Sequence, residues 1–205
     1  MNEIIFASGN KAKRAQFQFV ANYLKLPSAI VSVYERFPEV KLYSEEYGTQ
    51  EEIVERGAHE IYAQVKQPIV VEDTILQVDA LNGMPGLRSN EYLKKNGRLG
   101  LLKELTDATD RSARIVSIVG YYDGKLLVSF KTIVEGSIAR EELFKTGEPG
   151  WVAPTPENNF GGGFNAVFMV GATGKTLAQM TAEEGLTYGY REPNFNALLR
   201  YLAPA

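Results

Sequence analysis

The chain contains no cysteine and only one histidine, His59, among its 205 residues. Without cysteine it can form no disulfide, no thiolate nucleophile and no Cys-ligated zinc or iron–sulfur site. A single histidine excludes a multi-histidine metal site, and any Ser-His-Asp relay would have to run through His59. The sequence therefore favours chemistry carried by carboxylates, lysines, hydroxyls and backbone groups. A metal, if one takes part, would be a hard cation such as Mg²⁺.

Long apolar runs and a strong excess of charge are also absent. No run approaches the roughly 18 apolar residues that a membrane helix needs, and the N-terminal Met1-Asn2-Glu3 lacks the basic region of a signal peptide. The formal net charge of −3 argues against a basic face for duplex nucleic acid. We expect a cytoplasmic protein with no membrane and no nucleic-acid partner, large enough to bury a sizeable core.

Hydrophobic periodicity predicts a mixed α/β fold. Thr49 with Glu52 fits a capping box at a helix start, and Asp123-Gly124 is typical of a hairpin turn. No Gly-x-Gly-x-x-Gly follows the first strand, which weighs against a dinucleotide-binding fold. The stretch 147–163 is rich in Gly, Pro and Asn and reads as a loop. The predicted strands are 3–7, 29–33, 69–71, 75–80, 113–122, 125–134 and 164–170. The predicted helices are 11–24, 49–65, 93–105 and 195–202, of which the third is interrupted near Asn96-Gly97.

The first stretch that can carry chemistry is the turn before the first helix. Ser8 and Gly9 precede the helix, and Lys13 lies in its first turn. Backbone N–H groups and the positive end of a helix dipole suit phosphate, and Ser8 is a candidate cap. A capped helix with solvated lysines explains the same residues, so both interpretations stay open here.

Acidic residues form the second stretch. Glu45 and Glu46 precede a glycine, and Glu72 and Asp73 stand at the exit of a buried strand. Carboxylates from two segments suit a Mg²⁺ that also takes substrate phosphates, and one of them can deprotonate the attacking water. Adjacent strand residues point to opposite faces, so only one of Glu72 and Asp73 need face a given cleft. The acids of the 49–65 helix are better explained as a solvated face.

Two further stretches carry weaker signals. Gly174-Lys175-Thr176 lacks the Walker A glycine five residues before Gly174, where Met169 stands, so it is no P-loop. The glycine–aromatic run 160–164 and the run 188–191 offer rings and one arginine that would suit a base. On local evidence these aromatics are better explained as core residues.

The order of these motifs resembles the inosine triphosphate pyrophosphatase family, also called XTP/dITP diphosphatases, over nearly the whole chain. The stretch 79–86 is its most specific part. The resemblance implies a single domain over 1–205, an elongated mixed sheet with flanking helices whose two lobes surround a central nucleotide cleft. It implies a homodimer and hydrolysis of ITP, dITP or XTP to the monophosphate and pyrophosphate, with Mg²⁺ as cofactor and Mn²⁺ as an alternative.

The resemblance also assigns roles to single residues. Asp73 would be the general base or a second metal ligand, and Lys13 would act on the phosphates. The implied metal ligands are Glu46, Glu72 and Asp73. The implied substrate-binding residues are Ser8, Gly9, Asn10, Lys13, Thr74, Phe160, Phe164, Asn165, Lys175, Tyr190 and Arg191.

Departures from the family pattern concentrate at the positions that would contact the purine base of the nucleotide. Where relatives have Phe-Gly-Tyr-Asp-Pro, this chain places Gly162 at the Phe and Asn165 at the Asp, with Phe160 as a substitute ring. Tyr190 stands at the His of Ser-His-Arg, and Gly185 at a phosphate-side lysine. Two alternatives stay open. The run Ile5-Phe6-Ala7-Ser8, followed by Lys13-Arg14, also resembles a Maf-like pyrophosphatase with another base preference. The changes at Gly162, Gly185 and Tyr190 would suit a catalytically weakened nucleotide-binding protein.

Overall fold

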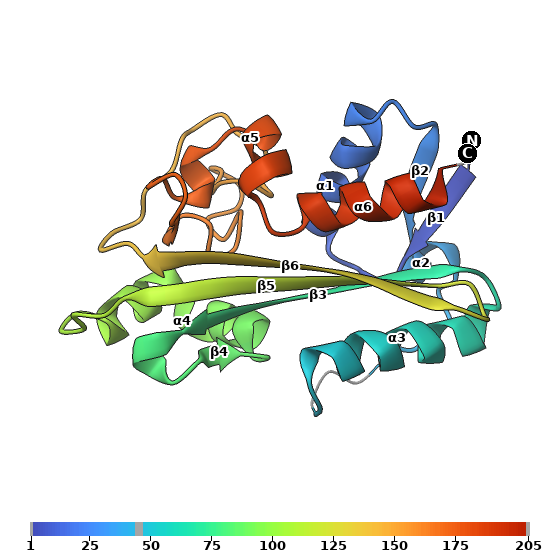
Figure 1. Ribbon diagram of the computed structural model, residues 1–205, viewed down its shortest axis with the longest axis horizontal. Coiled ribbons are helices and arrows are strands. Elements are labelled where there is room, and N and C mark those ends of the chain that lie inside the picture. Colours follow the sequence, from blue (N-terminus) through green and yellow to red (C-terminus); the bar gives the residue numbers. More distant parts are fainter. Residues whose placement is uncertain (1, 44–46, 204–205) are drawn as a thin grey trace. The chain divides into compact units, whose positions relative to one another are not determined.

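The structure is a computed structural model that describes residues 2–43 and 47–203 (Figure 1). Its sheet has the strand order β2-β1-β3-β5-β6-β7, and β4 pairs with β3. The prediction of a mixed sheet with flanking helices is confirmed. The strands are β1 Asn2–Phe6, β2 Ser28–Ser32, β3 Ile69–Val78, β4 Met84–Gly86, β5 Ser112–Tyr122, β6 Leu127–Ile138 and β7 Phe168–Val170. The helices are α1 Lys11–Tyr23, α2 Val33–Arg36, α3 Gln50–Val65, α4 Ser89–Glu104, α5 Ala182–Tyr188 and α6 Glu192–Leu202.

The chain divides into two compact units. Unit 1 comprises Met1–Asp73, Ser117–Thr132 and Arg191–Ala205, and unit 2 comprises Thr74–Val116 and Ile133–Tyr190. Because β3, β5 and β6 are long, each contributes one part to each unit.

In unit 1, parallel strands carry a helical layer on each face. β1 pairs in parallel with β2 and with β3. Helices α1 and α6 pack against each other on one face, and α3 covers the other face (Figure 1). The core beneath α1 and α6 is aromatic: the ring of Phe17 stacks on Phe195 at 4.2 Å, and both rings meet Phe6 edge-on. These three buried rings fix the distance between α1, α6 and β1.

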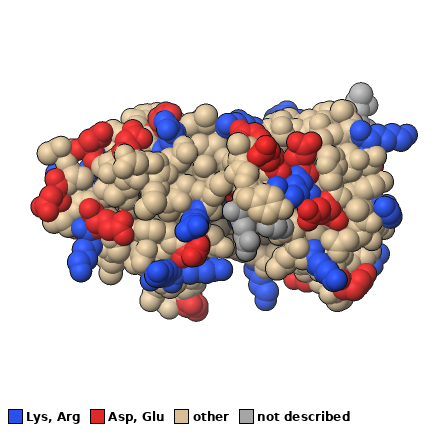
Figure 2. Space-filling view, turned by 90° about the horizontal axis from the view of Figure 1, so that it is seen from below, with Lys and Arg blue, Asp and Glu red and all other residues tan. Residues whose placement is uncertain are grey.

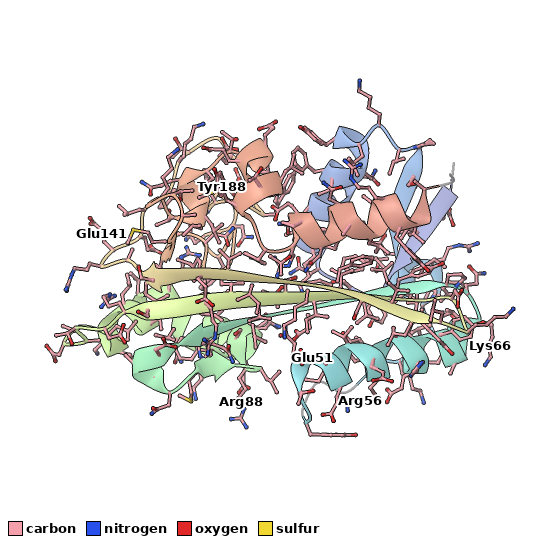
Figure 3. The ribbon with its side chains drawn as sticks, in the orientation of Figure 1. Glu51, Arg56, Lys66, Arg88, Glu141 and Tyr188 are labelled. Carbon is pink, nitrogen blue, oxygen red and sulfur yellow. The ribbon has the colours of Figure 1, made fainter. Side chains whose placement is uncertain are left out.

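Helix α3 begins as its sequence predicts. The Thr49 hydroxyl accepts the backbone N–H of Glu52, and the Glu52 carboxylate accepts the N–H of Thr49, so the capping box is confirmed. Figure 3 shows Glu51 near this start of the helix and Lys66 just beyond its end. Lys66 closes the helix in the left-handed conformation, at φ 54°.

Unit 2 is built around one apolar cluster that includes Leu76, Leu101 and Phe168. The end of β3 pairs antiparallel with β4, and the end of β6 pairs antiparallel with β7. Helix α4 is interrupted at Gly97, whose φ of 66° is non-helical, as the predicted break near this residue requires.

Three predictions of secondary structure need correction. The expected strands 69–71 and 75–80 are one continuous strand, β3. The expected strand 164–170 shrinks to Phe168–Val170, because Gly162 and Gly163 take positive φ and residues 164–167 form turns with local hydrogen bonds. Helix α5 is missed because its seven residues give little periodicity, although the Thr181–Glu184 capping box marks its start.

The described surface carries charges of both signs. On the face that Figure 2 shows, Lys and Arg side chains are interspersed with Asp and Glu side chains. Among the described residues, none of the helices combines the length and the apolar character needed to cross a membrane.

The aromatic core of unit 1 yields a stability prediction. Substituting Phe17→Ala removes a fully buried ring that contacts Phe6 and Phe195, so the free energy of unfolding should fall by about 3–5 kcal/mol. Urea unfolding followed by circular dichroism measures this change. Tyr23→Ala, on the same helix with its side chain exposed, is the control and should cost about 0.5 kcal/mol or less. Equal costs for both variants would contradict this account of the core.

Candidate functional site

The turn before α1 is exposed and its polar groups organise the helix start. Asn10 is the N-cap: its Oδ1 accepts the backbone N–H groups of Ala12 and Lys13 at 2.9 and 3.3 Å. The Ser8 Oγ accepts the backbone N–H of Asn10 at 3.2 Å, so the helix cap is Asn10 rather than Ser8. A Cβ added at Gly9 would meet only the Tyr34 ring at 3.8 Å, which leaves the space above the turn open. The turn thus presents the positive end of the α1 dipole.

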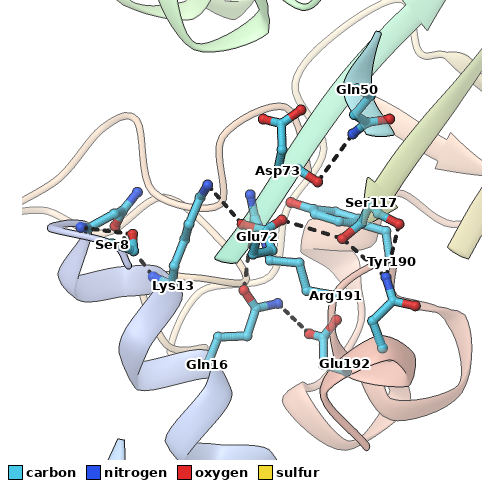
Figure 4. Close-up of polar contacts among 12 residues, drawn as sticks. Ser8, Lys13, Gln16, Gln50, Glu72, Asp73, Ser117, Tyr190, Arg191 and Glu192 are labelled. Atoms are coloured by element: carbon cyan, nitrogen blue, oxygen red, sulfur yellow. Dashed lines mark hydrogen bonds and ion pairs between the residues drawn. The ribbon is translucent and has the colours of Figure 1, made fainter. Parts of the chain in front are cut away.

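A buried carboxylate, Glu72, contacts two cations of unit 1, Lys13 and Arg191 (Figure 4). Its Oε2 lies 2.8 Å from the Lys13 Nζ, and its Oε1 accepts a hydrogen bond of 2.9 Å from the Arg191 Nε. The Ser117 hydroxyl adds a contact of 3.3 Å to Oε1. The Glu72 side chain has no exposed surface, whereas Lys13 and Arg191 retain 22% and 15%. Both cations therefore stand between this buried anion and solvent.

Asp73 follows Glu72 on β3 but points to the other side of the strand (Figure 4). Its backbone carbonyl accepts a hydrogen bond of 3.2 Å from the Gln50 Nε2 on α3. The side chain is half-buried. The side chains of Glu72 and Asp73 thus lie in different surroundings, although the two residues are neighbours in the sequence.

A second buried pair lies behind Arg191. The Gln16 Nε2 donates to the Glu192 Oε1 at 2.7 Å, and the Gln16 Oε1 accepts from the Arg191 Nη1 at 3.4 Å. The Asn194 Nδ2 donates to the Ser117 carbonyl at 2.9 Å. Sequence reasoning missed these polar residues. The available signal was a glutamine within the apolar stripe of α1, beside Phe17 and one turn before Val20.

In unit 2, the predicted base-side residues are mainly buried. The amide of Asn165 donates to the carbonyls of Val152 and Trp151 at 3.0 and 3.3 Å. Its Oδ1 accepts a hydrogen bond of 3.2 Å from the Tyr190 hydroxyl. Phe164 belongs to the apolar cluster of the unit. The two residues that replace the Asp and His of the resembled pattern are thus hydrogen-bonded to each other.

The remaining predicted residues of unit 2 are Thr74, Phe160 and Lys175. Thr74 is half-buried on β3, and Phe160 is exposed. The Lys175 Nζ lies 3.2 Å from the Glu184 Oε1 in an exposed pair. The pKa of Glu184 lies below its ordinary value, chiefly because its carboxylate accepts the N–H of Thr181, and then because of Lys175.

The loop that carries Phe160 is held by Arg98, which sequence reasoning also missed. This buried guanidinium on α4 pairs with Glu142, donates to the Gly163 carbonyl at 2.8 Å, and donates to the Asn159 carbonyl. A Cβ at Gly162 would stand 2.4 Å from the Val152 carbonyl, so the loop requires glycine there.

One predicted metal ligand, Glu46, lies outside the described residues. Within residues 2–43 and 47–203, His, Asp and Glu side chains do not form a group of three that would suit a metal ion. The side chains of Glu72 and Asp73 point to opposite sides of β3, so these two acids do not belong to one group. Their assignment as metal ligands stays a prediction.

A family model described as the Ham1 family matches residues 4–201 of the chain. The chain belongs to the Ham1 family. It is 29% identical over 202 residues to a dITP/XTP pyrophosphatase of Pyrococcus horikoshii, a match that covers 98% of this chain and 96% of the relative. It is 33% identical over 157 residues to a dITP/XTP pyrophosphatase of Thermococcus kodakarensis, covering 75% and 74%.

The fold of this Ham1 chain is that of solved relatives. The Ham1 protein of Staphylococcus aureus superimposes with a TM-score of 0.76 at 26% identity, covering 98% of each chain. The resemblance read from the motif order is thereby confirmed. The roles of the individual site residues remain predictions.

The buried ion pairs of Glu72 lead to a prediction about stability. Substituting Glu72→Gln in this Ham1 chain removes the anion from between Lys13 and Arg191, and breaking a buried pair in this way should cost about 3–5 kcal/mol of unfolding free energy. Chemical denaturation measures the loss. The control is Glu51→Gln, which breaks the exposed pair with Lys131 and should cost under about 1 kcal/mol. Similar losses in both variants would refute the anchoring role of Glu72.

Proposed function

We propose that this chain hydrolyses non-standard purine nucleoside triphosphates (ITP, dITP and XTP) to the monophosphate and pyrophosphate. The observation that carries the proposal is the cluster of Lys13 and Arg191 on the buried Glu72, next to the exposed turn of α1. Membership of the Ham1 family supports it, since relatives of similar length bear the name dITP/XTP pyrophosphatase.

The turn and Lys13 suit the triphosphate. The start of α1 offers the positive end of its dipole, and Gly9 leaves room above the turn. An ammonium has three hydrogen-bond donors, so Lys13 can bond a phosphate oxygen while it keeps its contact with Glu72. Glu72 in turn limits the cost of holding two cations close together.

Asp73 is the proposed general base. It is half-buried near the middle of β3, directly after the buried run 69–72, and its carboxylate does not share the face of Glu72 with the two cations. In this role Asp73 takes a proton from the water that attacks the α-phosphate, and pyrophosphate leaves.

The donor set fits Mg²⁺, which accepts one or two carboxylates together with substrate phosphates. Glu46 and Glu72 would hold the ion, and Asp73 would be a further ligand in the alternative to its role as the base. When bound, Mg²⁺ neutralises developing charge on the phosphates. For Glu72 the ligand role is the weaker part of the proposal, because Lys13 and Arg191 already occupy its two oxygens.

The base preference is where this chain should differ from its relatives. Arg191 is the residue proposed to contact the base. In unit 2, Asn165 and Tyr190 bond each other, and the Asn165 amide bonds backbone carbonyls. A side chain whose polar groups are engaged in this way contributes less to discrimination between bases. This observation favours a broad preference among triphosphates over strict selection of ITP and XTP.

We further propose that the protein is a cytoplasmic homodimer.

A nucleotide panel tests the proposal. With Mg²⁺ present, wild-type protein should release pyrophosphate from ITP, dITP and XTP, and Asp73→Asn should lose about 100-fold or more of kcat, since it lacks the base. Glu60→Gln, an exposed acid on α3, is the matched control and should keep wild-type rates.

The outcomes separate the alternatives. Full activity of Asp73→Asn would refute the role of Asp73 as the base, and no turnover of any triphosphate would refute the proposed hydrolysis. Preference for UTP or dTTP would indicate a Maf-like pyrophosphatase. Tight binding of a non-hydrolysable triphosphate without turnover would indicate a nucleotide-binding protein.

A further inference from the structure

A buried carboxylate that the proposed chemistry does not use, Glu192, stands at the start of α6. It is 5% exposed, its Oε1 is bonded to Gln16, and its Oε2 has no hydrogen-bond partner among the described residues. Burial raises the pKa of Glu192, against the opposing effects of Gln16 and Arg191. An acid in the first turn of a helix is favourable while exposed to solvent, so helix stability alone does not require its burial.

Gln16 links this carboxylate to Arg191. A carboxylate only accepts hydrogen bonds and a guanidinium only donates them, so the Gln16 amide can face them in one orientation. Its Nε2 meets Glu192 at 2.7 Å and its Oε1 meets Arg191 at 3.4 Å. Gln16 is itself 2% exposed, which leaves little room for another rotamer.

Arg191 is consequently held from two sides. Glu72 accepts its Nε, and Gln16 accepts its Nη1 (Figure 4). Two acceptors at different nitrogens define the plane of the guanidinium as well as its position. The resulting chain of contacts runs Lys13, Glu72, Arg191, Gln16, Glu192, in which charges of opposite sign alternate on either side of the neutral amide.

We propose that Gln16 and Glu192 are positioning residues that orient Arg191 for contact with the nucleotide. This inference rests on the proposed function, in which Arg191 touches the substrate. A guanidinium that already holds its binding orientation loses less conformational entropy when the ligand arrives. The competing explanation is that the pair only joins α1 to α6; it would then affect stability without affecting nucleotide affinity.

Calorimetry with a non-hydrolysable ITP analogue and Mg²⁺ distinguishes the two explanations. Gln16→Leu removes both contacts, and loss of a hydrogen bond to a charged group should raise Kd about ten-fold. In the hydrolysis assay KM should rise similarly, with kcat within about two-fold. Arg191→Ala should weaken binding at least as much.

A reciprocal exchange provides the rescue. Glu192→Gln alone should weaken binding, whereas Gln16→Glu combined with Glu192→Gln retains a carboxylate for Arg191 and a hydrogen bond between the two helices. The double variant should return Kd to within about three-fold of wild type. Since Glu192→Gln preserves side-chain size, the comparison of its Kd with that of the double variant tests the positioning role even if Gln16→Leu does not fold.

The control for stability is Ile61→Ala. Ile61 is a fully buried residue of α3, on the other face of the sheet from α1 and α6, so this variant should lower Tm without changing Kd. Wild-type Kd in Gln16→Leu and Glu192→Gln, while Arg191→Ala binds poorly, would overturn the inference and leave the proposed function standing. A double variant that binds no better than Glu192→Gln would also overturn it. Binding that follows these predictions without any turnover would support the inference and refute the hydrolysis.

Discussion

The ion pairs of the buried Glu72 are the interaction on which the candidate site depends. A carboxylate with no exposed surface needs partners, and Lys13 on α1 and Arg191 at the start of α6 supply them. Lys13, proposed to bind phosphate, and Arg191, proposed to contact the base, are therefore both held by one carboxylate on β3. The stacked rings of Phe17 and Phe195 hold the same two helices together, so apolar packing and charge pairing support one geometry.

Glu72 and Asp73 lie in different surroundings because successive side chains of a strand point to opposite faces. Glu72 faces the helices and holds cations; Asp73 faces the other way, where we propose that it handles water and metal. A buried ion pair seldom stabilises a fold more than apolar residues would. The ion pairs of Glu72, and the second carboxylate that Glu192 supplies through Gln16, are therefore better explained by the placement of Arg191 than by a gain in stability.

Local signals predicted the local structure. The Thr49–Glu52 capping box, the Asp123-Gly124 hairpin and the break at Gly97 each depend on a few adjacent residues, and each is confirmed. Contacts between distant residues left no such trace: Gln16 and Glu192 are 176 positions apart, and only the fold brings them together. The pairing of Asn165 with Tyr190 was hidden for the same reason, although both positions were singled out. Family resemblance supplied the roles that spacing alone left open.

The central claim is that Lys13 and Arg191, gathered on Glu72, form the nucleotide-binding cluster of this chain. The most direct measurement is a crystal structure of the chain with a non-hydrolysable ITP analogue and Mg²⁺. We expect the Lys13 Nζ within hydrogen-bond distance of a phosphate oxygen, and the Arg191 guanidinium in contact with the nucleotide while its Nε still bonds Glu72. A nucleotide bound elsewhere, with both cations still paired only to Glu72, would contradict the account.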